Sequence, residues 1–505
     1  MATPTESTGS LVLARYSGEL TTKARPTRAY FSKRLAANVK DGLRALGIRS
    51  RIERGHDRLR IQLASTDDAT RALPVLSRTF GVQSVVGAIE LPWSSTDDIV
   101  REGVRLFADA VAGRRFAVRA RRVGDRARIA ASSSDVARAL GAALAPRAAG
   151  VDLDDPEVAV HVEVAPGRAH FFRDVARGPG GLPLGVEGRA VALVSGGFDS
   201  AVAAWQLLRR GVALDYVFCN LGGRTHELGT MRVAKHLADA WSYGTRPQLH
   251  SVDFDSVSAD LQRACTTRYW QVVLKRRMLR AAELVAAERG AAAIATGEAI
   301  GQVSSQTLQN LAVISRATTV PILRPLVGMN KDDILASARA IGTFELSKVV
   351  GEYCALVPSK PATAATLGAI EAEETKLDAG LLDAAVAARS VFDLRALDLA
   401  TLDDPTLQVD DVPEGATLLD LRSKPAYQTW HAPGALFLDF ADAVRAYASF
   451  DRAHRYALYC EFGLKSGHLA ELMRAEGMQA VSIRGGAAAL RRRLDAARAR
   501  DVGSE

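Results

Sequence analysis

"AVALVSGGFDSAVAAWQLLRRG", residues 190–211, joins an apolar run to a helical pattern through a loop that contains Gly196 and Gly197. The run at 190–194 predicts a buried strand, and the spacing of the apolar residues after the loop predicts a helix. The glycines let the backbone come close to a ligand, and the free N–H groups at the start of a helix attract phosphate. We therefore predict a phosphate-binding loop between a strand and a helix.

The polar residues of this loop restrict its chemistry. Ser195 and Ser200 add hydroxyl donors, whereas Asp199 would repel a bare phosphate, so we expect Asp199 to hold Mg²⁺ or to order the loop. The chain contains no GxxxxGK[ST] pattern, which excludes a Walker-type ATPase. An ordinary glycine-rich turn is the alternative interpretation, and the complete string SGGFDS disfavours it.

The sequence around the loop alternates between strands and helices. Apolar runs at 190–194, 214–220 and 291–296 are separated by helical segments, which indicates a parallel sheet with helices on both faces. A helix is predicted at 364–388, and the acidic stretch after it resembles a linker.

The N-terminal part predicts smaller mixed α/β modules that end at the turn-rich "RGPGGLPLG", residues 177–185. The predicted helices lie at 28–47, 95–112 and 132–144, and a strand is predicted at 58–65. Residues 1–185 carry 29 Lys and Arg against 20 Asp and Glu, so the net charge of +8 is concentrated there. Its densest part, residues 114–130, alternates in part like a strand and suits a polyanion, although a solvated basic face is the simpler alternative.

Cys460 ends the apolar run of "RYALYCEFGLKSGHLAELM", residues 455–473. The residues "EFGLKS" have the length of a loop whose N–H groups point at the sulfur. With Lys465 expected nearby, this geometry stabilises a thiolate and makes Cys460 a candidate nucleophile. A buried structural cysteine is the alternative, which we adopt for Cys219, in an apolar strand, and for Cys265, in an expected helix. The residues alone leave Cys354 unassigned. Four cysteines in 505 residues without CxxC spacing predict neither a disulfide framework nor a zinc site.

Composition favours a multidomain protein in the cytoplasm. The length predicts three or four domains, and no stretch is long and apolar enough for a membrane helix or a signal peptide, so no membrane partner is expected.

Several stretches together resemble the tRNA 4-thiouridine synthase (ThiI) family. SGGFDS resembles the PP-loop of ATP pyrophosphatases, and "CEFGLKS" with 418–440 resembles a rhodanese active site. The other matching stretches are 217–237, 272–282, 295–311, 322–334 and 351–363. The resemblance implies a multidomain α/β chain: a ferredoxin-like and a THUMP module, a PP-loop (adenine nucleotide alpha hydrolase-like) parallel-sheet domain and a rhodanese α/β domain. The predicted boundaries are a disordered lead-in at 1–12, ferredoxin-like 13–68, THUMP 69–176, PP-loop 186–395, linker 396–415 and rhodanese 416–500.

The resemblance also assigns roles to individual residues. Asp199 and Lys331 are implied to act in activating the substrate, Cys460 to carry a persulfide and Cys354 to form a disulfide with it. Arg119, Arg121 and Arg122 are candidates for RNA contacts. The implied ATP-binding residues are Leu193, Val194, Ser195, Gly196, Gly197, Ser200, Lys275, Gly297 and Gln306. Without the surrounding motif, Lys275 would be interpreted as a surface lysine and Gln306 as a loop hydrogen bond.

The implied reaction uses ATP and Mg²⁺ to adenylate O4 of tRNA uridine 8, and sulfur from Cys460 then yields 4-thiouridine. The implied partners are tRNA, a cysteine desulfurase that holds the pyridoxal phosphate this chain lacks, a ThiS-type sulfur carrier of thiamine synthesis and a second copy in a homodimer. Gly351 before "EYC" and Lys465 in the active loop depart mildly from the family pattern.

Two other classes of function remain as alternatives. An enzyme that adenylates a carboxylate for amide formation leaves the basic N-terminal part unexplained. An RNA-binding adaptor leaves the two loops SGGFDS and "CEFGLKS" unexplained.

Overall fold

The computed structural model describes residues 10–350, 360–402, 404 and 406–502. They form two compact units. The first comprises Met1–Glu187 with the short segments Arg209–Gly211 and Tyr243–Thr245, and the second comprises the rest of the chain. No helix in the described parts is both long enough and apolar enough to cross a membrane.

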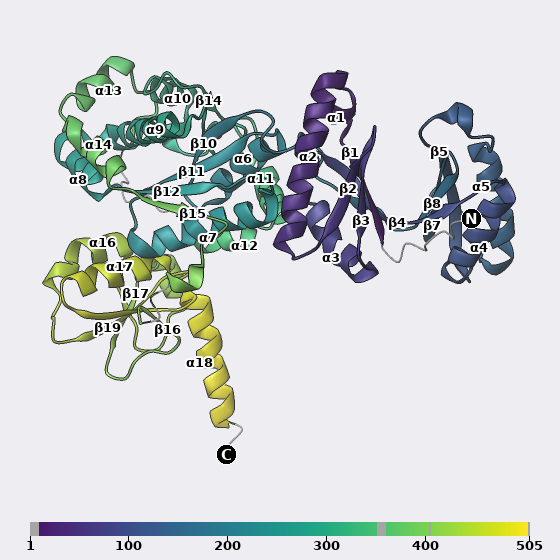
Figure 1. Cartoon of the computed structure of the whole chain (residues 1–505). Coiled ribbons are helices and arrows are strands. Elements are labelled where there is room, and N and C mark those ends of the chain that lie inside the picture. The colour runs from purple at the N-terminus through teal and green to yellow at the C-terminus, as the bar shows by residue number, and fades with distance from the viewer. Residues whose placement is uncertain (1–9, 351–359, 403, 405, 503–505) are drawn as a thin grey trace. The chain divides into compact units, whose positions relative to one another are not determined.

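The first unit is built on one nine-stranded sheet in the order β2-β3-β1-β4-β8-β7-β5-β6, with β9 paired to β4. The long strand β4 joins two α/β modules, because its first half pairs with β1 and its second half with β8 (Figure 1). The strands are β1 Leu11–Tyr16, β2 Ser50–Arg54, β3 Arg58–Leu63, β4 Val82–Pro92, β5 Arg115–Arg122, β6 Gly150–Val151, β7 Val158–Ala165, β8 Arg168–Phe172 and β9 Ala176–Arg177.

All the α-helices of this unit except the second begin at a serine side chain that caps them, a residue type that the sequence shows clearly. Ser95 caps α4 in a reciprocal capping box with Asp98, and Ser132 caps α5. The helices are α1 Gly18–Thr21, α2 Arg25–Ala45, α3 Thr66–Leu76, α4 Thr96–Val111 and α5 Ser133–Leu144. One apolar core contains residues of β1, α2, α3 and the first half of β4, and a second contains residues of α4, α5, β5 and β7.

The second unit contains two parallel sheets. The larger has the order β14-β13-β10-β11-β12-β15, parallel except for β15 at its edge. Its strands are β10 Arg189–Leu193, β11 Ala213–Asn220, β12 Gln248–Asp253, β13 Ile294–Ala295, β14 Ile322–Leu323 and β15 Ser390–Asp393. Its helices are α6 Phe198–Arg209, α7 Gly223–Trp241, α8 Asp255–Ala264, α9 Trp270–Arg289, α10 Leu308–Ser315, α11 Lys331–Ile341, α12 Phe344–Val350, α13 Leu367–Glu374 and α14 Ala379–Ala387. The predicted parallel α/β architecture is confirmed.

The smaller parallel sheet has the order β16-β20-β19-β17-β18. Its strands are β16 Gln408–Val409, β17 Thr417–Asp420, β18 Leu436–Phe437, β19 Arg455–Tyr459 and β20 Gln479–Ile483. Its helices are α15 Lys424–Thr429, α16 Phe440–Ala446, α17 Leu464–Ala475 and α18 Gly486–Val502. Cys460 directly follows β19 and belongs to the core on one side of this sheet.

One predicted element is wrong. The stretch 364–388 is two helices, α13 and α14, instead of one. Asp378 caps α14 by accepting the N–H of Gly380, and its own N–H donates to Asp260 Oδ2 at 2.8 Å. These contacts turn the chain between the two helices.

Candidate active site

The phosphate loop lies at the carboxyl edge of the larger sheet. Strand β10 is central, with β11 on one side and β13 on the other, and residues 194–197 connect β10 to α6. The strand order reverses at this point, and ligands of open α/β sheets bind at such a switch point. The position therefore agrees with the predicted nucleotide site.

Hydrogen bonds within the loop fix its shape. Ser200 Oγ accepts the N–H of Ser195 at 3.3 Å and donates to the carbonyl of Gly197 at 3.1 Å. Gly196 has a φ of +76°, and a Cβ there would lie 2.9 Å from Thr230 Oγ1 and from a methyl of Val350. Glycine is thus required at this position both by its backbone angle and by its neighbours.

Gly297 packs directly against the start of α6. A Cβ at Gly297 would lie 2.7 Å from the Asp199 carbonyl carbon and from the Ser200 nitrogen. The structure thereby brings this predicted residue, which follows β13 in the chain, together with the phosphate loop.

Asp199 and Lys331 form an ion pair at the loop. Lys331 Nζ donates to Oδ1 and Oδ2 of Asp199 at 2.9 and 3.0 Å. Lys331 is the first residue of α11, and Asp199 lies in the first turn of α6. The lysine thus offsets the carboxylate that would otherwise repel a phosphate.

Lys275 belongs to a buried charge cluster around Glu298. Lys275 Nζ lies 3.0 Å from Glu298 Oε1, and Arg324 Nε lies 2.8 Å from Oε2. Burial opposes ionisation of this carboxyl, but the two cations outweigh it and hold the pKa of Glu298 below its ordinary value. Two cations around one carboxylate leave a positive charge beside Gly297, which suits a polyphosphate.

The remaining predicted ATP-binding residues lie at the same edge. Gln306 is 9% exposed, and its Oε1 has no hydrogen-bond partner within the part of the chain that the structure describes. Leu193 ends β10, and the N–H of Val194 donates to the carbonyl of Val217 at 2.9 Å. The unpartnered amide oxygen of Gln306 is available to a ligand.

The described residues offer Mg²⁺ few ligands. They contain no group of three or more His, Cys, Asp or Glu side chains able to hold a metal ion. Asp199 supplies a carboxylate at the loop, and Lys331 donates to both of its oxygens. Because Mg²⁺ commonly uses one or two carboxylates together with phosphates and waters, the site fits an ion that arrives with the nucleotide.

His226 is a neutral side chain behind the loop. Its Nε2 lies 3.3 Å from the carbonyl oxygen of Ser195, and its ring meets Phe218 edge to face. Burial lowers the pKa of His226 to about 4, so the ring is uncharged at pH 7.

Cys460 sits in a cradle of donors. The N–H of Gly463 lies 3.2 Å from Cys460 Sγ, and Ser466 Oγ lies 3.5 Å from it. Ser482 Oγ lies 2.8 Å from Ser466 Oγ and thereby holds that hydroxyl in place. Lys465 is not part of this cradle, since its Nζ lies over the ring of Phe440. The backbone donor expected from the sequence is thus present, whereas the lysine expected near the sulfur lies against Phe440 instead.

The other cysteines differ from Cys460. Burial raises the pKa of Cys219, which lies in β11, well above its ordinary value. Burial also raises the pKa of Cys265 to about 11, and this residue follows α8 instead of lying within a helix. Both thiols are therefore protonated at neutral pH. Cys354, the implied disulfide partner, lies outside the described residues.

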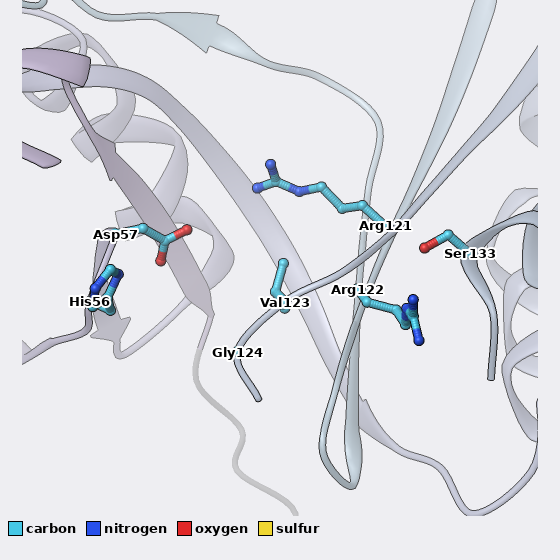
Figure 2. Close-up of a pocket in the computed structure, with 7 residues that line it drawn as sticks. All are labelled: His56, Asp57, Arg121, Arg122, Val123, Gly124 and Ser133. Carbon is cyan, nitrogen blue, oxygen red and sulfur yellow. The ribbon is translucent and has the colours of Figure 1, made fainter. Parts of the chain in front are cut away.

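The candidate RNA-binding arginines lie on β5 in the first unit. Arg121 and Arg122 line a cavity of about 790 Å³ with His56, Asp57, Val123, Gly124 and Ser133. Figure 2 shows the two arginines extending to opposite sides of the strand. Arg119 donates to the carbonyl of Leu153. Among the described residues, Arg121 forms an ion pair, with Glu163, whereas neither Arg119 nor Arg122 does.

Arg121 belongs to a buried cluster that joins the two modules of this unit. Glu163 on β7 is 1% exposed and pairs with Arg15 and Arg58 of the first module, and Arg121 Nε lies 2.8 Å from its Oε1. Asp57 also pairs with Arg58. Arg121 therefore has a structural partner that the sequence did not reveal.

Several site residues were missed from the sequence. Glu298 and Arg324 lie inside matched stretches, but Glu298 contacts Lys275 across 23 positions of the chain and Arg324 across 26. His226 lies in "GGRTHELG", and its polar type within a helix was the available signal. No sequence pattern marks Ser482 as a site residue, because only the fold brings β20 to the loop that follows Cys460.

Family models match nearly the whole chain in the order expected from the sequence. They are described as ThiI ferredoxin-like domain (residues 11–86), THUMP domain (94–174), Thiamine biosynthesis protein ThiI (185–379) and rhodanese-like domain (404–492). A tRNA sulfurtransferase of Pyrobaculum aerophilum is 39% identical over 473 residues, which cover 92% of this chain and 95% of the relative. The chain belongs to the tRNA sulfurtransferase family.

Other relatives agree with this assignment. A tRNA sulfurtransferase of Pseudomonas aeruginosa is 38% identical over 478 residues, with 92% and 97% of the two chains covered. The solved structure of a 4-thiouridine synthetase in complex with RNA and with bound ATP is 29% identical, with a TM-score of 0.66, and covers 76% of this chain and 99% of its own. A solved protein of Pyrococcus horikoshii, 23% identical with a TM-score of 0.52, shares the fold and covers 66% of this chain and 99% of its own.

Proposed function

We propose that the chain transfers sulfur from a persulfide on Cys460 to uridine 8 of tRNA and forms 4-thiouridine through an adenylated uridine. The observation that supports this most is the presence, in one compact unit, of a phosphate loop with an Asp199–Lys331 pair and a cysteine loop whose donors face the sulfur. Neither site alone completes the reaction, because one activates an oxygen and the other supplies sulfur.

In the first step, O4 of the uridine attacks the α-phosphorus of ATP, and pyrophosphate leaves. The loop N–H groups, Lys331 and the cluster around Glu298 offset the charge of the phosphates. Mg²⁺ bound to the phosphates would neutralise further charge, with Asp199 as its protein ligand. Adenylation makes O4 a good leaving group.

In the second step, the outer sulfur of the Cys460 persulfide attacks C4, and AMP leaves with O4. The thiolate of Cys354 then attacks Cys460 Sγ, which releases the sulfur to C4 and forms a Cys354–Cys460 disulfide. In the alternative order, Cys354 first releases sulfide, which then attacks C4. The products are the same: 4-thiouridine, AMP and the Cys354–Cys460 disulfide. Both thiols supply the two electrons that reduce the sulfur, and a dithiol reductant reopens the disulfide.

The proposal includes partners. A cysteine desulfurase loads Cys460, tRNA binds the basic first unit, and a second copy forms a homodimer. The family description as a thiamine biosynthesis protein favours a second acceptor, the adenylated C-terminus of a sulfur-carrier protein. Light scattering of the purified protein tests the dimer.

Reconstitution tests the function. Purified protein, ATP, Mg²⁺, unmodified tRNA, a cysteine desulfurase with cysteine, and reductant are combined, and absorbance near the 4-thiouridine band is followed. Thionucleoside is expected with the wild type and with Cys265→Ser, a matched change at a buried thiol, and none with Cys460→Ala or Asp199→Asn. AMP formation that needs a small acid instead of tRNA would contradict the proposal.

A further inference from the structure

Helix α17, which begins just after the cysteine loop, packs on α7 of the neighbouring sheet within the same compact unit. Glu471 on α17 accepts the N–H of Arg224 at 2.9 Å and the hydroxyl of Thr225 at 2.6 Å. The N-cap of α7 is Gly222, which has no side chain to accept these donors. Glu471 therefore supplies, from the rhodanese-like domain, both the missing cap and a negative charge at the positive end of α7.

Glycines on both helices permit this close approach. A Cβ at Gly467 of α17 would lie 2.8 Å from Cγ2 and Oγ1 of Thr225. A Cβ at Gly223 of α7 would lie 2.5 Å from Glu471 Oε2 and 2.6 Å from His468 Nδ1. The contact therefore depends on glycines at facing positions of the two helices, which a contact between long surface side chains would not require.

Helix α7 also contacts the phosphate loop and residues that lie close in sequence to Cys460 and to Cys354. A Cβ at Gly229 would lie 2.9 Å from Val350 and 3.6 Å from Leu464, and Val350 also contacts the position of Gly196 in the phosphate loop. Leu464 follows Cys460 by four positions, and Val350 precedes Cys354 by four positions. One face of α7 therefore brings together the phosphate loop and the chain segments next to both cysteines.

We propose that α7 is the docking platform for the sulfur-carrying domain and that Glu471, through Thr225 and the N–H of Arg224, holds this domain in the position for sulfur delivery. The inference rests on the proposed function. It adds a surface that is needed only for sulfur transfer, after Cys460 has received its persulfide and the tRNA uridine has been adenylated. Disrupting this contact slows the transfer of sulfur to tRNA but leaves persulfide formation and uridine adenylation intact.

Gly467→Ala is the sharpest test, because its Cβ meets Thr225 of the other domain and alanine favours a helix. Glu471→Gln removes the charge that caps α7. Glu476→Gln is the matched control, since Glu476 lies at the other end of α17 and pairs with exposed Arg452 of its own domain. Three rates are measured for each variant: persulfide formation on Cys460 by mass spectrometry, tRNA-dependent AMP formation, and 4-thiouridine formation.

We expect Gly467→Ala and Glu471→Gln to keep persulfide and AMP formation within twofold of wild type and to lose at least tenfold in 4-thiouridine formation, whereas Glu476→Gln behaves as wild type. Free sulfide in the assay needs no docking and restores thiolation in both variants. Unchanged or faster thiolation in both variants would overturn the docking role. Failure of the proposed function is distinct, because the wild type itself would then form no thionucleoside.

Discussion

Lys331 Nζ lies within 3.0 Å of both carboxylate oxygens of Asp199, although the two residues are 132 positions apart in the chain. The pair places a cation and an anion at the first turn of α6, where a phosphate would bind. The ammonium group of Lys331 is thus close enough to the loop to leave the Asp199 carboxylate and bind a phosphate oxygen when ATP enters.

Lys331→Met is expected to lower the rate of tRNA-dependent AMP formation by about 100-fold or more, the usual effect of losing one group that stabilises transition-state charge. Asp199 then remains as an uncompensated negative charge at the loop. Lys348→Met is the control, because Lys348 is exposed on α12. AMP formation is measured with labelled ATP, and an undiminished rate in Lys331→Met would contradict this role.

Gly297→Ala is expected to weaken ATP binding, because the added Cβ lies 2.7 Å from the backbone of Asp199 and Ser200 and must displace the start of α6. Overpacking of this kind costs about 1–3 kcal/mol, which corresponds to roughly 5- to 150-fold in the dissociation constant. Isothermal titration with a non-hydrolysable ATP analogue measures it. Gly328→Ala, where a Cβ meets nothing within 4 Å, serves as the control and keeps wild-type affinity.

The Glu163 cluster makes the stability of the first unit depend on pH. Burial opposes ionisation of Glu163, but Arg58, Arg121 and Arg15 outweigh it and lower its pKa. A carboxyl with a lowered folded-state pKa stabilises the fold above its unfolded pKa of about 4.3 and loses this contribution as the pH falls towards the folded value. Thermal unfolding of the wild type is expected to shift to lower temperature below about pH 4.5.

Glu163→Gln tests the same cluster at pH 7. It leaves Arg58 and Arg15 without their buried counter-charge, so we expect a loss of about 3–5 kcal/mol in the free energy of unfolding. The variant should also lose the acid-dependent part of the transition. Glu157→Gln, at an exposed carboxylate near Arg115, is the control. Equal stability of Glu163→Gln and wild type would contradict a structural role of the cluster.

Arg122 is expected to contact tRNA phosphate, because it lines the cavity on β5, whereas Arg121 is held by Glu163. Arg122→Ala should weaken tRNA binding and reduce the slope of log K against log salt by about one, the effect of one lost phosphate contact. Arg138→Ala, at an exposed arginine of α5 paired with Asp135, is the control. The measurement is a filter-binding titration at several salt concentrations. An unchanged salt slope in Arg122→Ala would refute this contact.

The sequence predicted those features that depend on local patterns. The apolar run before Ser195 and the glycines after it were sufficient for β10, the loop and α6, and the spacing after Cys460 was sufficient for its cradle. Contacts between distant segments were not predictable. Nothing near Glu298 indicates Arg324, nothing near Thr225 indicates Glu471, and Asp378 breaks the helix expected at 364–388 by bonding to Asp260.

Transfer of a labelled sulfur in a single turnover tests the central claim most directly. The protein is loaded at Cys460 with ³⁵S by a desulfurase, freed of desulfurase and cysteine, and mixed with unmodified tRNA with or without ATP and Mg²⁺. The account predicts that the label moves to 4-thiouridine in the tRNA only when ATP is present, with one AMP formed for each sulfur transferred. Label that stays on the protein, or that leaves without ATP and never enters the tRNA, would contradict it.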